Sequence, residues 1–194
     1  MPDLYIIAGP NGAGKTTASY TILPNFLDCF EFINADEIAN SIAPQEPGKA
    51  AFDAGRIMLR QIDEHMESGV NFAVETTLSS KHYANIVKTA KSKGYSVSLI
   101  FLWLGSYEAA RERVRKRVEK GGHNIPPDVI ERRYRRGLYN FFHVFVSLCD
   151  NWILFDNNGL EPLIIASGET EAEIEQEDKS LFEKIKEKIN EYEY

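Results

Sequence analysis

The sequence predicts an α/β protein of the three-layer α/β/α type, in which helices cover both faces of a mainly parallel sheet. Short apolar runs alternate with longer segments of helical periodicity, and this alternation is typical of parallel sheets. The runs are continuously apolar, as in VSLIFLWL at residues 97–104, so we expect the strands to be buried on both faces. The chain has 194 residues, of which 43% are apolar and 26% charged, so one globular fold is expected.

Six strands are expected, with helices between the first five. The strands are residues 4–8, 30–34, 71–75, 97–104, 152–156 and 162–166. The helices are one that opens at Lys15, a short one in EIANSIA, and residues 48–68, 79–93, 107–120 and 127–149. The dipeptide Asn158-Gly159 between the last two strands is a turn signal, and it predicts a terminal hairpin rather than another crossover.

Acidic residues are concentrated near the C-terminal end of the sequence. Residues 169–194 hold 10 acidic and 4 basic side chains, a net charge of −6, while the whole chain carries −7. We therefore expect a nearly neutral domain over residues 1–168, followed by an acidic, helical tail over residues 169–194. The pattern LFEKIKEKI in that tail favours a solvated, charged helix.

Composition also indicates the compartment and argues against a zinc site. Cys29 and Cys149 lie far apart without a CxxC motif, which favours free thiols in a reducing compartment. The four histidines lack zinc-site spacing, so no structural zinc is expected. The first residues, MPDLYIIAG, contain neither a basic leader nor an apolar run long enough to cross a membrane. A cytoplasmic protein without a membrane partner is expected.

The segment GPNGAGKT at residues 9–16 follows the first strand and opens the first helix. It satisfies the G-x-x-x-x-G-K-[ST] motif of P-loops in the context that this motif requires. Its glycines permit a tight turn whose backbone N–H groups point at a β-phosphate. Lys15 is expected to reach the β- and γ-phosphates, and the Thr16 hydroxyl to coordinate Mg²⁺. The predicted ATP-binding residues are Gly9, Pro10, Asn11, Gly12, Ala13, Gly14, Lys15, Thr16 and Thr17.

Two other P-loop classes carry motifs that this sequence does not contain. Transport-type ATPases have an LSGGQ-like signature and a strand ending in Asp-Glu, and regulatory GTPases have an N-K-x-D motif. Small-molecule kinases are the remaining class. They need a base for the acceptor hydroxyl, an acceptor pocket and a cationic lid.

Two carboxylates follow strands at the expected ligand-binding edge of the sheet. Asp36, in FINADEIA, comes two residues after the second strand, where it would either accept the proton of an attacking hydroxyl or cap the next helix. Glu75, in FAVETTLSS, ends the third strand and is followed by Thr76. It would bind a hydroxylated acceptor, hold Mg²⁺ through water, or merely cap the crossover. The catalytic interpretation of Asp36 and the acceptor-binding interpretation of Glu75 and Thr76 are preferred.

Eight arginines and two lysines lie between Arg111 and Arg136, out of 22 basic residues in the chain. Two helices joined by the GGHNIPP turn would present them as a lid, at about residues 111–136, that stabilises charge on a transferring phosphoryl group. The alternative is ion pairing with nearby acidic residues in solvent, which must hold for some of them. A nucleic-acid surface is not expected, because the domain is nearly neutral and lacks an RNA-binding aromatic pattern. The lid candidates are Arg113, Arg117, His123, Arg132, Arg133 and Arg136.

These motifs together resemble the zeta-toxin family of P-loop kinases, in particular its short stand-alone bacterial members. The resemblance covers roughly residues 1–168, and GGHNIP…RRY is its most specific part. It implies ATP-dependent phosphorylation of a small molecule, which in better-known members is UDP-N-acetylglucosamine, and an antitoxin protein as partner. By position it makes Asp36 the catalytic base and Glu75 the acceptor-binding acid. Its two phosphate-contacting arginines stay open among Arg113, Arg117, Arg132 and Arg133, and of these Arg117 and Arg133 are the preferred catalytic residues together with Lys15.

A second function stays open at this point. The chain would then be an ATP-binding switch or ATPase that signals to a protein partner, with hydrolysis indifferent to any small acceptor. Asn157 and Asn158, in the loop FDNNG, lie where related kinases contact the base, so they are candidates for an adenine site.

Overall fold

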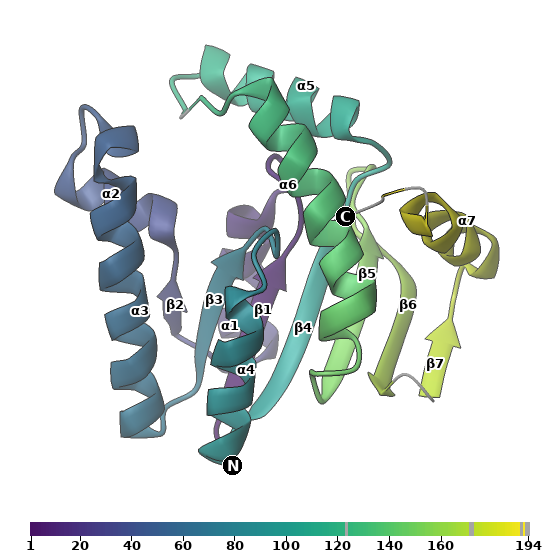
Figure 1. The fold of residues 1–194 in the computed structure, drawn as a ribbon, viewed down its shortest axis with the longest axis horizontal. Helices are drawn as coiled ribbons and strands as arrows, with labels where there is room; N and C mark the ends of the chain where they lie inside the picture. Colours follow the sequence, from purple (N-terminus) through teal and green to yellow (C-terminus); the bar gives the residue numbers. More distant parts are fainter. Residues whose placement is uncertain (123, 171–172, 191, 193–194) are drawn as a thin grey trace.

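The computed structural model describes residues 1–122, 124–170, 173–190 and 192, and His123 therefore lies outside the described residues. Its centre is a seven-stranded sheet with the order β2-β3-β1-β4-β5-β6-β7 (Figure 1). The strands are β1 (Asp3–Ala8), β2 (Glu31–Ile33), β3 (Phe72–Thr76), β4 (Ser96–Trp103), β5 (Asn151–Asp156), β6 (Leu163–Thr170) and β7 (Glu173–Gln176).

The first five strands run parallel, and β6 and β7 are antiparallel. The α/β prediction with a mainly parallel sheet is confirmed, and so is the terminal hairpin, which β5 and β6 form. The order β2-β3-β1 brings the carboxyl ends of three strands together next to the loop that leaves β1. That edge is where open α/β sheets bind their ligands.

The helices are α1 (Lys15–Phe26), α2 (Ala35–Ile42), α3 (Ala51–Ser68), α4 (His82–Ser92), α5 (Tyr107–Glu119), α6 (Pro127–Asn140) and α7 (Lys179–Asn190), with a 3₁₀ turn at Pro47–Ala50. Figure 1 shows α4 and α6 on one face of the sheet, and α5 beyond its upper edge. In the described part of the chain, no helix combines the length and apolarity needed to span a bilayer.

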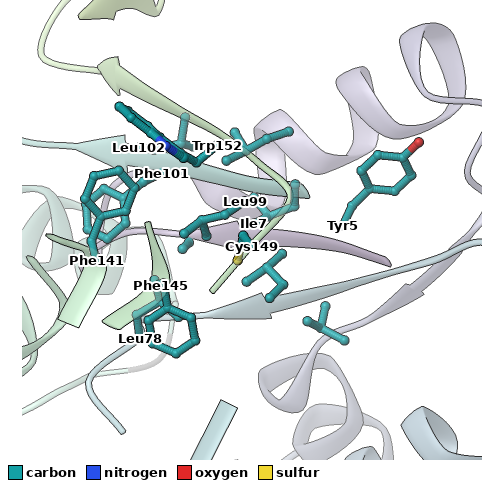
Figure 2. Packing of buried hydrophobic residues seen from close by; sticks show 14 of the residues in the cluster. Tyr5, Ile7, Leu78, Leu99, Phe101, Leu102, Phe141, Phe145, Cys149 and Trp152 are labelled. Carbon is teal, nitrogen blue, oxygen red and sulfur yellow. The ribbon is translucent and has the colours of Figure 1, made fainter. Parts of the chain in front are cut away.

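One predicted helix ends early. Residues 127–149 were expected to form a single helix, but α6 ends at Asn140 and a π-helical turn follows over Phe141–Phe145. The N–H of Val146 donates to the carbonyl of Phe141 at 3.0 Å, five residues back, which widens the turn. Phe141 and Phe145 are fully buried, and Figure 2 shows them in the core with Leu78.

The helix predicted in the C-terminal segment is present, with most of its charged side chains exposed, but the segment packs into the fold where a fully solvated tail was expected. Residues 173–176 form β7, a strand that was not expected, and α7 buries Phe182, Ile185 and Ile189. The Phe182 ring lies parallel to that of Trp152, with ring centroids 6.4 Å apart. The charged residues of LFEKIKEKI therefore occupy only one side of an amphipathic helix.

Helix α6 is fixed to the loop that follows β3. Asn140, buried at 4% exposure, donates from its side-chain amide to the carbonyl of Leu78 at 2.7 Å. One turn earlier, Gly137 lies so close to this loop that an added Cβ would be 2.2 Å from the carbonyl oxygen of Thr77. On the other side, the hydroxyl of Tyr134 donates to the carbonyl of Leu104 at 2.6 Å. Helix α6, the second helix of the predicted lid, is therefore fixed against the turn after β3 and against Leu104.

We expect Gly137→Ala to lower the free energy of unfolding by about 1–3 kcal/mol, because the new methyl group must displace backbone rather than a flexible side chain. Urea unfolding measures the change. Gly55→Ala is the matched control, since nothing lies within 4 Å of a Cβ at this helical position. It should raise stability by up to about 1 kcal/mol. Equal effects of the two substitutions would contradict the close contact at Gly137.

Candidate active site at the P-loop

The loop between β1 and α1 is shaped by glycine. Gly9, Gly12 and Gly14 have φ values of 141°, 79° and 77°, which other residues adopt only with strain. A Cβ on Gly9 would lie 2.4 Å from the carbonyl oxygen of Leu102, so the loop is pressed against the end of β4. Helix α1 begins at Lys15 without a side-chain cap, which leaves the first N–H groups of the helix for an anion.

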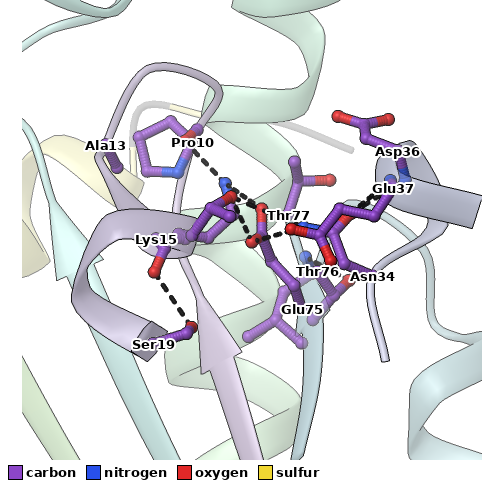
Figure 3. Close-up of polar contacts among 12 residues, drawn as sticks. Pro10, Ala13, Lys15, Ser19, Asn34, Asp36, Glu37, Glu75, Thr76 and Thr77 are labelled. Carbon is purple, nitrogen blue, oxygen red and sulfur yellow. Dashed lines mark hydrogen bonds and ion pairs between the residues drawn. The ribbon is translucent and has the colours of Figure 1, made fainter. Parts of the chain in front are cut away.

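A buried polar cluster joins the P-loop to the ends of β2 and β3 (Figure 3). The Lys15 ammonium donates to the carbonyl of Pro10 at 3.1 Å and lies 3.6 Å from the Glu75 carboxylate. The second oxygen of that carboxylate accepts from the Thr16 hydroxyl at 2.7 Å and from the Asn34 amide at 2.8 Å. The side chains of Lys15 and Glu75 are only 6% and 13% exposed. Glu75 therefore does more than cap the crossover after β3.

The register of the sheet explains why Lys15, Asn34 and Glu75 lie close together. Ile33 of β2 lies beside Val74 of β3, so Asn34 and Glu75 leave the sheet as neighbours, and Ile7 of β1 lies beside Glu75 on the other side. Asn34 is a site residue that sequence reasoning missed. Its signal was available, because Asn34 ends an apolar strand with a polar side chain, as Glu75 does.

Burial lowers the pKa of Lys15, since the ammonium has left water. The carboxylates of Glu75 and Asp36 oppose this effect, and the guanidinium of Arg117 adds to it. The charges of Asp36 and Arg117, two predicted catalytic residues, thus both affect the pKa of the P-loop lysine.

Asp36 does not cap helix α2. Asn34 is the N-cap, and its side-chain oxygen accepts from the N–H of Asp36 at 2.8 Å and from that of Glu37 at 3.4 Å. The capping interpretation of Asp36 is therefore wrong. The Asp36 side chain is exposed, and Figure 3 shows its carboxylate standing clear of the bonded cluster.

The remaining P-loop residues lie around this cluster. Asn11 is 7% exposed and its side-chain oxygen is buried without a hydrogen-bond partner, Ala13 is fully buried, and Thr17 is exposed on the first turn of α1. At the end of β3, the hydroxyl of Thr76 accepts from the N–H of Leu78 at 3.1 Å, and this contact holds the turn in which Leu78 has a φ of 53°. The Thr76 side chain is thus already engaged within its own loop.

The lid arginines divide into groups. Arg115 pairs with Glu112 and Glu119, and Arg135 pairs with Glu131, which confirms that part of the cluster forms surface ion pairs. Arg113 donates to the carbonyls of Asn157 at 2.8 Å and Asn158 at 3.1 Å, on the side of the P-loop away from Glu75. Arg132 is exposed and Arg133 half-buried on α6.

A cavity of about 580 Å³ lies between the start of α4 and helix α6. It adjoins the turn after β3, in which the hydroxyls of Thr77 and Ser79 are 2.9 Å apart. Two cationic side chains and three hydroxyls line it, and this lining suits an anionic group. The lining residues are Ser79, Ser80, Lys81, Arg136, Tyr139 and Asn140.

Comparison with known proteins identifies the family of this chain. The family model of the zeta toxin matches residues 1–159. The chain belongs to the zeta toxin family. A protein of Haemophilus influenzae, itself described as uncharacterized, is 35% identical over 128 residues, which are 65% of this chain and 88% of that protein.

Solved structures share the fold. The complex AvrRxo1-ORF1:-ORF2 with ATP aligns with 95% of this chain at a TM-score of 0.76 and 20% identity, and the chain spans 63% of the length of that protein. A structure of the PezAT toxin-antitoxin system of Streptococcus pneumoniae covers 98% of this chain and 87% of its own, with a TM-score of 0.66 and 16% identity. A gluconokinase from Sinorhizobium meliloti gives 0.53 at 16% identity, over 81% and 83% of the two chains. The fold of this zeta toxin relative is that of P-loop kinases.

The lowered pKa of Lys15 predicts a pH dependence of stability. Between its folded pKa and its ordinary value of 10.5, the unfolded chain binds more protons at this residue than the folded one, so stability rises with pH. We expect the free energy of unfolding of the native sequence to rise relative to that of Lys15→Met as pH increases toward 10.5. Urea unfolding of both proteins across this range measures it, and a constant or falling difference would contradict the burial of the ammonium.

Proposed function

We propose that this zeta toxin relative transfers the γ-phosphoryl group of ATP, with Mg²⁺, to a hydroxyl of a small molecule. The observation that carries the proposal is the arrangement around Lys15. The P-loop lysine and Thr16 are locked to Glu75 and Asn34, while a second carboxylate, Asp36, stays exposed beside them. Binding of a triphosphate alone does not require that second carboxylate, whereas transfer to a hydroxyl needs a base there.

The residues present fit Mg²⁺. This ion prefers oxygen ligands and is commonly held by one or two protein groups together with the phosphates of the substrate. Thr16 and Glu75 offer a hydroxyl and a carboxylate whose oxygens are 2.7 Å apart, so both can serve one ion, with Glu75 acting directly or through water. When bound, the ion supplies charge neutralisation at the phosphates.

The other roles follow from charge and position. Lys15 would bind the β- and γ-phosphates, and its low exposure keeps water away from that contact. Arg117 on α5, together with Arg133 on α6, would stabilise charge on the transferring group from the lid side. Asp36 would accept the proton of the acceptor hydroxyl. Arg132 and Arg136 extend the positive charge along the same helix as Arg133.

We propose an anionic acceptor, and UDP-N-acetylglucosamine is the first candidate. The cavity beside the turn after β3 supports this choice, because Lys81 and Arg136 face it and its volume of about 580 Å³ accommodates more than a single phosphate. Glu75 and Thr76 would then lie at the hydroxyl end of the acceptor. The direct test incubates the protein with MgATP and UDP-N-acetylglucosamine and follows ADP release and phosphorylated product by mass spectrometry. Acceptor-independent hydrolysis without product would favour an ATPase switch instead.

An antitoxin protein is the proposed partner, and the cytoplasm the proposed compartment. The support for the partner is the family and the likeness to the PezAT structure, which is described as a toxin-antitoxin system. The support for the compartment is the cysteine pattern, since Cys29 and Cys149 are both buried free thiols. Burial raises the pKa of Cys29 to about 11 and of Cys149 to about 12, so both stay protonated and unreactive.

We expect Asp36→Asn to lower the rate of acceptor phosphorylation by about 10²- to 10⁴-fold, since the amide cannot take up the proton. Binding of ATP and the unfolding free energy should change little, because the carboxylate is exposed. Glu37→Gln at the neighbouring position is the control, because the native Glu37 carboxylate accepts a hydrogen bond from the Tyr20 hydroxyl at 2.5 Å and has no assigned role in the reaction. Full phosphorylation activity in Asp36→Asn would remove Asp36 from the mechanism.

We expect Lys81→Ala and Arg136→Ala each to raise the KM for the anionic acceptor by about tenfold, with the KM for ATP unchanged, because each removes one charged contact. Steady-state kinetics with each substrate varied in turn measures both constants. Lys88→Ala, exposed further along α4, serves as the control for loss of charge. An increase in the KM for ATP instead would place the cavity on the nucleotide side of the site.

A further inference from the structure

The loop that leaves β5 is held from three sides. The side chain of Asn157 donates to the carbonyl of Ala13 in the P-loop at 2.6 Å. The side-chain oxygen of Asn158 accepts from the N–H of Gly105, at the start of the connection to α5, at 2.9 Å. The third contact is that of Arg113, whose guanidinium donates to the carbonyls of both asparagines. Residues 156–158 therefore bridge the P-loop and the first lid helix.

Arg113 also sits directly against the P-loop. A Cβ on Gly12 would be 3.0 Å from the Cβ of Arg113 and 3.0 Å from the carbonyl oxygen of Ala110. Ala110 and Val114 on the same side of α5 are buried. The beginning of α5 is consequently packed onto the loop that binds phosphate, and only glycine at position 12 allows this approach.

From these contacts we infer that Arg113 is a positioning residue, and that it does not contact the phosphates of ATP. Its guanidinium holds the carbonyls of Asn157 and Asn158, and Asn157 in turn holds the P-loop at Ala13. A charged donor shared between two carbonyls fixes the loop more firmly than a neutral contact does. Through this chain of contacts Arg113 sets the distance between the P-loop and the 156–158 loop, and with it the affinity for nucleotide as a whole.

Arg117 is the matched contrast, one helical turn further along α5. Its charge contributes to the lowered pKa of Lys15, and under the proposed function Arg117 would act on the γ-phosphate. A residue that stabilises the γ-phosphate distinguishes ATP from ADP, whereas a residue that positions the loops affects both nucleotides alike. The nucleotide part of this inference rests on the proposed function, and the hydrogen-exchange part below does not.

Calorimetric titration with MgADP and MgATP tests the first part. Arg113→Ala should weaken both by about tenfold and leave their ratio unchanged, while Arg117→Ala should weaken MgATP more than MgADP. Arg113→Lys should recover part of the affinity, since a lysine can reach one carbonyl but not both. A loss confined to MgATP in Arg113→Ala would overturn the inference and make Arg113 a phosphate contact.

Hydrogen exchange of the nucleotide-free protein tests the second part. In Arg113→Ala, amide exchange should rise in residues 156–162 and in the P-loop. Exchange in β4 and α6 should stay unchanged, and this result would exclude global unfolding as the cause. Asn157→Ala should raise exchange in the P-loop alone, by removing only the contact to Ala13. Unchanged exchange in both loops would overturn the inference. If the native protein binds neither nucleotide, the proposed kinase activity fails, and the exchange result still decides the role of Arg113.

Discussion

Placing one lysine ammonium in the protein interior is the constraint around which this site is organised. A buried charge is costly unless an opposite charge and hydrogen bonds compensate it. Lys15 therefore needs Glu75, and Glu75, itself mostly buried, needs donors for its second oxygen, which Thr16 and Asn34 supply. These four residues come from the P-loop helix and from the ends of β2 and β3. The strand order β2-β3-β1 is what makes their meeting possible.

The same constraint separates two carboxylates by task. Glu75 is committed to Lys15, Thr16 and Asn34, so it is poorly placed to take up a proton during a reaction. The Asp36 carboxylate is not needed as a helix cap, because the side-chain oxygen of Asn34 already caps the N-terminus of α2. Asn34 thus links the two acids, since its amide nitrogen binds Glu75 and its oxygen caps the helix that carries Asp36. One amide side chain therefore holds Glu75 and caps the helix on which Asp36 is exposed.

The sequence predicted those parts that depend on short-range patterns. The P-loop, the parallel strands and the β5–β6 turn each follow from a few adjacent residues, and Asp36 and Glu75 followed from their place after strands. A polar residue at the end of an apolar strand was the available signal for Asn34, but its contact with Glu75 depends on the register between β2 and β3, which no local pattern contains. Burial of α7 was missed for a similar reason: Phe182 packs on Trp152, 30 positions earlier in the sequence, and charge alone indicated solvent. The contacts of Arg113 with the carbonyls of Asn157 and Asn158 could not be predicted, because spacing on a helix does not identify a side chain's partners.

The two helices of the predicted lid are not free along their whole length, because each is anchored at one end. Helix α5 packs directly on the P-loop because Gly12 has no side chain, and Arg113 binds this helix to the loop after β5. At the other end, Gly137 and Asn140 hold α6 against the turn after β3. Both anchored ends lie at the sheet, so any closing movement must take place in the part between them, which carries Arg117, Arg132 and Arg133. In the proposed kinase, these arginines would then move toward the γ-phosphate, while the parts of the site proposed to bind nucleotide and acceptor keep their shape.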